Sequence, residues 1–292
     1  MIHAKICPDA TWSQASTIVA SFSDINPQDF SINNFDEIFI PDELNHTIRK
    51  YSPDSSTKWS KPLGSTYLSQ PTSIFVDLSD NIYIWDSEKY QVNFWSSSNR
   101  NLRTLLSFDQ CKNSAQFNQI CYANSIVADE NRTIYISESS NAYSHTNRVM
   151  KFQFNTTVGH VIAGTSRSGS AANQLDLPQT ILLDADENLY VADIGNSRIQ
   201  KFSLGQRNGK TIASIAELID FTMDTNGDLY VLTQSDNTIQ RIRQMSMYRN
   251  KENIIRSVQQ SSRIHFGFDG SIYVLNEKKK SIDKFEIINN HC

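Results

Sequence analysis

The sequence predicts an all-β fold made of six similar four-stranded units, and three observations support this prediction. A short apolar segment with an aromatic residue at its third position occurs six times along the 292 residues. The turns between apolar segments are rich in Asp, Asn and Gly, which accept the backbone conformations of hairpin connections. No stretch has the length and periodicity of a long helix. The six copies read EIFIPD, NIYIWD, TIYISE, NLYVAD, DLYVLT and SIYVLN.

Further strands flank each copy. An apolar strand that usually ends in Asp precedes the aromatic anchor, another strand follows it, and a weaker fourth strand often comes next. Anchors lie 40 to 55 residues apart, and four-stranded units of about 40–45 residues are typical of β-propeller blades. The sequence therefore predicts a six-bladed β-propeller. Its anchors are Phe39, Tyr83, Tyr135, Tyr190, Tyr230 and Tyr273, and the strand-ending residues are Asp77, Asp129, Asp184, Asp224 and Asp269.

One unit carries a family resemblance. The stretch LPQTILLDADENLYVADIGNSRIQKF, residues 177–202, resembles an NHL repeat, and the other five copies are degenerate. Two linkers also match in register, because NQICYANSIVAD at 118–129 aligns with NQLDLPQTILLD at 173–184. The resemblance covers nearly the whole chain. It implies a six-bladed propeller that acts as a binding platform.

The two ends of the chain are expected to complete one blade. The last copy stops after its third strand, whereas the N-terminal segment at about residues 11–21 resembles a fourth strand. We expect this segment to join blade six, since an unpaired edge strand is a liability for a sheet protein. Residues 1–292 would then form a single propeller domain.

The expected closure gives the four cysteines partners. Cys7 precedes the N-terminal strand and Cys292 follows the last one, so antiparallel pairing of these strands brings the two residues together. Cys111 and Cys121 share the linker between blades two and three and form the second predicted pair. The alternative is four free thiols in a cytoplasmic protein. Disulfides favour an extracellular or secretory location.

Three glycosylation sequons agree with that location, although Asn, Ser and Thr are abundant in the chain. They begin at Asn45, Asn131 and Asn155, all in predicted turns or loops. No secretory signal is visible at the N-terminus, which we interpret as an incomplete N-terminus. No apolar run approaches the roughly 20 residues that span a bilayer. The net charge of -4 gives no basic field for nucleic acid.

The residues were also searched for catalytic and metal-binding patterns. Zinc catalysis needs about three ligands, and the histidines, among them His265 on a first strand, show no zinc-binding spacing. The segments DADEN and DTNGD resemble calcium loops only superficially and are interpreted as turns. No nucleophile elbow, P-loop or dinucleotide motif is present. We therefore expect no catalytic residue, no metal and no cofactor.

Binding is expected on the loop-rich face of blades three and four. Long loops on a rigid scaffold often carry binding residues, and Tyr122, Tyr143 and His145 lie in them. The lysines of NEKKKSI, residues 276–282, are interpreted as a solvated loop, with contact to an acidic partner as the alternative.

These observations lead to a functional expectation with two alternatives. We expect a monomeric, extracellular, non-catalytic scaffold that binds a protein, peptide or glycan, with neither a nucleic-acid partner nor a membrane span. The first alternative is an intracellular NHL module of the ubiquitin-ligase or RNA-regulator type. The second is a metal-dependent lyase or lactonase, because six-bladed propellers include such enzymes.

Overall fold

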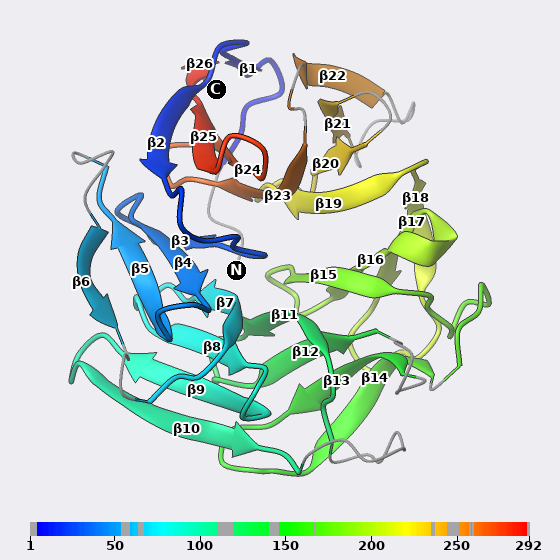
Figure 1. Cartoon of the computed structure of the whole chain (residues 1–292). Coiled ribbons are helices and arrows are strands. Elements are labelled where there is room, and N and C mark those ends of the chain that lie inside the picture. The colour runs from blue at the N-terminus through cyan, green and yellow to red at the C-terminus, as the bar shows by residue number, and fades with distance from the viewer. Residues whose placement is uncertain are drawn as a thin grey trace. The chain divides into compact units, whose positions relative to one another are not determined.

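The computed structural model describes residues 5–53, 59–63, 67–109, 119–139, 146–165, 167–234, 237–243, 251–256, 258 and 260–290. It contains six four-stranded antiparallel sheets, so the predicted fold class, a six-bladed β-propeller, is confirmed (Figure 1). Within these residues the only helix is a single 3₁₀ turn, Ile194–Asn196, and no helix is long and apolar enough to cross a membrane. The chain divides into two compact units, Thr66–Ala216 and Ile2–Ser65 with Glu217–Cys292.

The first unit holds blades two, three and four, and each blade uses four strands that are consecutive in sequence. Blade two contains β7 (Pro71–Val76), β8 (Ile82–Asp86), β9 (Gln91–Ser96) and β10 (Asn101–Ser107). Blade three contains β11 (Ala123–Ala128), β12 (Ile134–Glu138), β13 (Asn147–Phe152) and β14 (Gly159–Thr165). Blade four contains β15 (Pro178–Leu183), β16 (Leu189–Asp193), β17 (Arg198–Phe202) and β18 (Lys210–Ser214).

The second unit holds blades one, five and six. Blade one contains β3 (Ser31–Ile32), β4 (Ile38–Asp42), β5 (Thr47–Tyr51) and β6 (Trp59–Leu63). Blade five contains β19 (Leu218–Met223), β20 (Leu229–Thr233), β21 (Thr238–Ile242) and β22 (Lys251–Arg256). Blade six contains β23 (Ser261–Phe266), β24 (Ile272–Asn276), β25 (Ser281–Phe285) and the N-terminal strand β2 (Thr17–Ser21).

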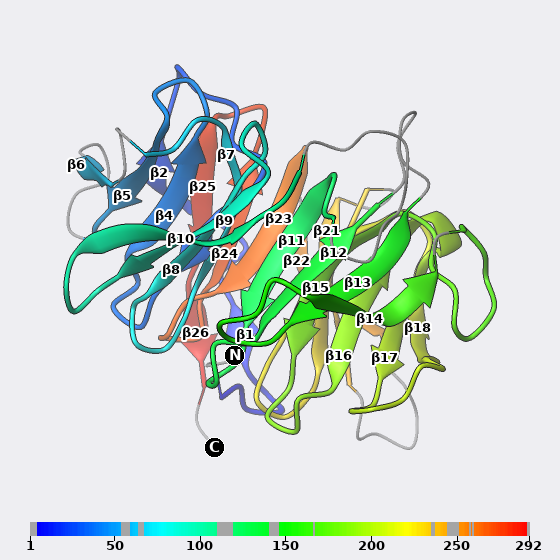
Figure 2. The same cartoon turned by 90° about the horizontal axis from the view of Figure 1, so that it is seen from below.

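Blade six is completed from the N-terminus, as predicted. Strand β2 pairs antiparallel with β25, and Figure 2 shows the blue strand beside the red one. The predicted strand was too long, because Thr11–Trp12 forms a separate short strand, β1, that pairs with β26 (Ile287–Asn289). Trp12 is buried and its indole N–H donates to the carbonyl of Gly270 at 3.0 Å. This hydrogen bond fixes the Trp12 side chain against the turn before β24.

The second strand of every blade is buried along its whole length. All five residues of β4, β8, β12, β16, β20 and β24 are buried. Side chains alternate between the two faces of such a strand. One face of each strand packs into a hydrophobic cluster with a neighbouring blade of the same unit, and β12 and β24 do so with both faces. This burial explains why the anchor segment is the best-preserved part of the repeat.

Candidate functional site

The repeated aspartates are turn residues, as the sequence indicated. In blade four, Asp184 Oδ1 accepts the backbone N–H groups of Asp186 and Asn188 at 3.0 and 2.8 Å. Its Oδ2 accepts the Tyr190 hydroxyl at 3.1 Å and Lys201 Nζ at 3.2 Å. Burial opposes ionisation, but these hydrogen bonds from Asn188 and Lys201 hold the pKa of Asp184 below its usual value.

The same arrangement recurs in blades three and five, whereas Asp77 of blade two accepts the two backbone N–H groups but not a tyrosine hydroxyl. Asp129 and Asp224 accept two backbone N–H groups and a tyrosine hydroxyl in the same way. In blade six, however, the predicted position was wrong, because Gly267 occupies the place of the turn aspartate and pairs with Ser271. Asp269 lies two residues later and accepts only the N–H of Ser271 from the turn backbone. The first strand therefore ends at Phe266.

A second repeated interaction is an ion pair between the second and third strands, at the other end of the second strand from the turn aspartates. An acidic residue at the end of the second strand holds an arginine of the third strand in the pairs Arg49–Asp42, Arg148–Glu138 and Arg198–Asp193, with N–O distances of 2.7, 2.9 and 2.6 Å. All three carboxylates are essentially buried. These pairs therefore belong to the scaffold.

The predicted binding and modification residues fall in different places. Tyr122 is 43% exposed, whereas Tyr143 and His145 lie outside the described residues. Asn45, Asn131 and Asn155 are exposed in turns, and their glycosylation stays a prediction. Asn45 also donates to Asp42 at 2.8 Å.

The cysteine predictions are covered only in part by the structure. Cys7 and Cys121 are disulfide-bonded, and no described cysteine is a free thiol. Cys111 and Cys292 lie outside the described residues, so the two pairings stay predictions.

One first-strand position departs from the repeat. His265 of β23 pairs in register with the anchor Tyr273 of β24. At the matching position the other blades carry small or apolar residues, and none of these carries an ionisable group. These residues are Ser31, Phe75, Val127, Leu182 and Thr222. Departures from a repeat that otherwise keeps its local rules are expected at functional sites.

His265 has a cation beside it on the same strand. Arg263 and His265 are two residues apart, so both side chains lie on one face of β23. That face meets the segment before β3, where Phe30 contacts the imidazole edge-on with ring centroids 4.7 Å apart. Asp29 lies next to Phe30, and its Oδ1 is 3.6 Å from Arg263 Nε. Asp29, Phe30, Arg263 and His265 are called the His265 site below.

The His265 imidazole is neutral at neutral pH and becomes protonated only in acid. Burial, with a smaller contribution from Arg263, lowers the pKa of His265 to about 4. Within the described part of the chain, neither ring nitrogen of His265 has a hydrogen-bond partner, and the residue is only partly buried. The site thus combines an unoccupied basic nitrogen with a fixed cation, which is the pairing needed to accept a proton and stabilise a developing anion.

The described residues do not fit a metal centre. Among them no group of three His, Cys, Asp or Glu side chains is arranged to hold an ion. Sequence reasoning placed His265 on a first strand but missed Arg263 and Asp29. Comparing the six copies position by position would have singled out His265, whereas Asp29 reaches the site only through packing between blades.

The comparisons with known proteins concern the fold. No family model matches the chain and no curated protein matches it, so the predicted NHL membership is not confirmed. Among solved structures, a streptogramin B lyase is similar with a TM-score of 0.63 at 12% identity, covering 94% of this chain and 97% of that one. A protein proposed to be a gluconolactonase is similar with a TM-score of 0.64 at 10% identity, covering 97% and 94%.

These findings contradict the expectation of a non-catalytic scaffold. The two solved structures named above are both described as enzymes. They favour the lyase or lactonase alternative over the binding scaffold and over the statement that the protein is not an enzyme. At such low identity the likeness itself shows the fold alone.

Proposed function

We propose that this chain is an enzyme of the lactonase or lyase type whose chemistry takes place at the His265 site. The observation that carries the proposal is the fold shared over nearly its full length with a streptogramin B lyase and a gluconolactonase-like protein. The His265 site supports it, because a neutral base beside a cation serves both reaction types.

In the hydrolytic reaction, His265 accepts a proton from a water molecule while the water oxygen attacks the lactone carbonyl carbon. Arg263 stabilises the negative charge that develops on the carbonyl oxygen, and Asp29, 3.6 Å from its Nε, orients the guanidinium. The ring carbon–oxygen bond then breaks, and the proton passes from His265 to the leaving alkoxide. The product is a hydroxy acid.

In the lyase reaction, His265 accepts the proton from a carbon atom next to a carbonyl group, and Arg263 stabilises the enolate oxygen that results. The enolate electrons then form a double bond to the next carbon, whose carbon–oxygen bond breaks. The oxygen leaves with the bonding electron pair, and His265 returns its proton to that oxygen or to solvent. We derive no step through a metal ion, because the described residues do not gather three ligands. The metal dependence of the earlier alternative is therefore not part of this proposal.

A second proposal concerns the repeat family and the cellular location. We propose an NHL-like repeat whose cysteines pair as Cys7–Cys292 and Cys111–Cys121 in an oxidising compartment. The contact between the two ends supports the first pair, since the Cys7 N–H donates to Asn290 Oδ1 at 2.8 Å, two residues before Cys292.

Activity assays with designed variants test the function. The purified protein is incubated with gluconolactone, followed by acid release, and with streptogramin B, followed by mass spectrometry. A hydrolysed ring gains the mass of one water, whereas elimination within a ring leaves the mass unchanged. We expect His265→Asn to abolish turnover and Arg263→Met to reduce kcat by at least about 100-fold.

His160→Asn is the matched control, because His160 is exposed on β14, outside the site. It should leave turnover unchanged. Equal turnover by the wild type, His265→Asn and Arg263→Met, or no turnover of a broad lactone panel by the folded wild type, would contradict the proposal.

A further inference from the structure

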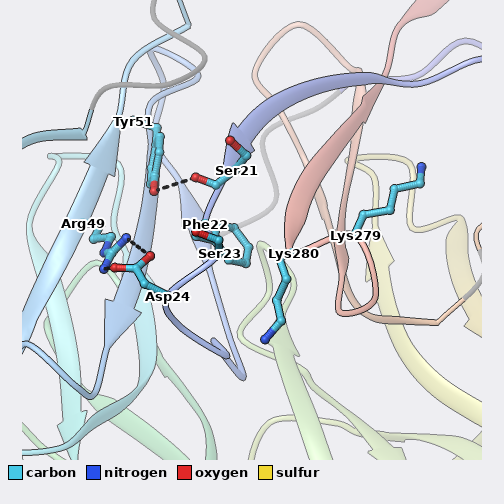
Figure 3. A pocket seen from close by; sticks show the side chains of 8 residues that line it. All are labelled: Ser21, Phe22, Ser23, Asp24, Arg49, Tyr51, Lys279 and Lys280. Atoms are coloured by element: carbon cyan, nitrogen blue, oxygen red, sulfur yellow. Dashed lines mark hydrogen bonds and ion pairs between the residues drawn. The ribbon is translucent and has the colours of Figure 1, made fainter.

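A polar cleft of about 440 Å³ lies in the second unit, near the end of β2 (Figure 3). Its walls come from the segment after β2, from β5 of blade one and from the loop between β24 and β25. The volume lies within the range of small-molecule sites. The lining residues are Ser21, Phe22, Ser23, Asp24, Arg49, Tyr51, Lys279 and Lys280.

Arg49 is the deepest charge of this cleft. Its side chain is only 5% exposed, and its Nε binds the buried Asp42 at 2.7 Å. The outer edge of the guanidinium binds Asp24 through two parallel bonds of 3.0 and 2.6 Å, and Figure 3 shows the two groups face to face. The Asp24 side chain, which covers this edge of the guanidinium, is 58% exposed to solvent.

The corresponding arginines of two other blades are closed by backbone. In blade four, Arg198 donates to the carbonyl oxygens of Ser170, Ala171 and Gln174. In blade three, Arg148 donates to the carbonyl of Gln119. These carbonyls belong to the segments that hold the blades together. In blade one the solvent-exposed carboxylate of Asp24 takes their place. The outer edge of this guanidinium therefore already binds an anionic group.

The cleft also holds donors with capacity to spare. Lys279 is bound to Asp283 at 2.6 Å, but Lys280 makes only a long contact of 3.4 Å to the Ile25 carbonyl. In the described part of the chain, the hydroxyl groups of Ser21 and Ser23 have no hydrogen-bond partner. An ammonium group and two hydroxyls thus line the same cleft as Arg49, with Lys280 on the wall that faces Arg49 across the cleft (Figure 3).

We propose that this cleft binds the phosphate or carboxylate group of a small anionic ligand, which displaces Asp24 from Arg49. Lys280 provides the second cation, and Asp24 is the internal competitor that keeps the site closed. The proposal is independent of the function of the His265 site, because none of its lining residues belongs to that site.

Titrations with inorganic phosphate and with acetate test the proposal, followed by NMR at constant ionic strength. Asp24→Asn removes the competing charge and should tighten binding about three- to tenfold. In that background, Lys280→Gln should weaken binding about tenfold. Lys278→Gln is the matched control, because Lys278 is exposed in the same loop but does not line the cleft.

Each outcome bears on the proposal. Tighter binding by Asp24→Asn with a loss specific to Lys280→Gln supports it, and the stronger of the two probes identifies the ligand group. Equal weakening by the Lys278 and Lys280 variants indicates a diffuse positive field and overturns it, as does unchanged affinity in Asp24→Asn. Thermal melting confirms that all variants fold. Lactone turnover is measured separately and should not depend on Lys280.

Discussion

Blade six carries an ionisable ring, that of His265, at a position where the other blades carry small or apolar residues. The environment of that ring determines the expected pH dependence. Burial and the nearby Arg263 lower its pKa to about 4, whereas Tyr273 on β24 and Asp29 before β3 face the same region. If His265 is the base, kcat/KM should rise with pH through about 4 and stay level toward neutrality. A pH profile of kcat/KM checks this, and an acidic limb near the ordinary histidine value contradicts it.

The same residue should make stability sensitive to mild acid. The unfolded chain has a histidine pKa of 6.5 and the folded chain about 4, so unfolding takes up a proton between these values. Stability is therefore full above the unfolded value and falls as the pH drops toward the folded one. This group should cost about 2 kcal/mol between pH 7 and pH 5.

His265→Phe should remove that loss, since blade two carries Phe75 at the same position. Urea unfolding at the two pH values measures it, with His160→Asn as control. An equal loss in wild type and His265→Phe would refute the assignment.

Among the elements, the turn between the first and second strands depends on one carboxylate. Asp184→Ala leaves two backbone N–H groups without their acceptor and should cost about 2 kcal/mol of unfolding free energy. Asp186→Ala, an exposed position in the same turn, should cost almost nothing. Because the pKa of Asp184 is lowered, its stabilisation is present above 3.8 and lost as the pH falls through the folded value. Urea unfolding distinguishes the two variants.

The buried pair Arg148–Glu138 ties the third strand of blade three to the second. Arg148→Met should lower the unfolding free energy by about 3–5 kcal/mol, because an unpaired carboxylate then stays buried. The double variant with Glu138→Leu should recover part of that loss, since neither charge remains. A double-mutant cycle measured by urea unfolding gives the coupling, and additive effects would argue against a strong pair.

Local signals made the strands and turns predictable. The anchor strands are buried on both faces and are therefore apolar along their length, and turn aspartates such as Asp184 accept backbone N–H groups within four residues. The prediction failed where a residue depends on distant partners. Trp12, for example, bonds through its indole to Gly270, which is 258 residues away in sequence. The same reason hid Asp29, whose partner Arg263 is far away in sequence. Gly267 is a separate, local failure, because it takes the place of the turn aspartate and bonds to Ser271.

For the whole molecule, the cysteine pairs are the main open prediction. Non-reducing peptide mapping should find Cys7 joined to Cys292 and Cys111 joined to Cys121. Cys292→Ser should then lower the unfolding free energy by about 2–5 kcal/mol, since the first pair closes a very long loop. A fragment that joins Cys7 to any other cysteine would disprove the pairing, and the same variant under reducing conditions is the control.

Strand β2 also sets the order of events during synthesis. Residues 17–21 leave the ribosome long before their partner strand, residues 281–285, is made. The edge of β2 must therefore wait until the strands of the other five blades have been made, and its pairing carries a large loop-closure cost. Blade six becomes the final blade to form, and a circular permutant that places β2 directly after β25 should fold without this delay.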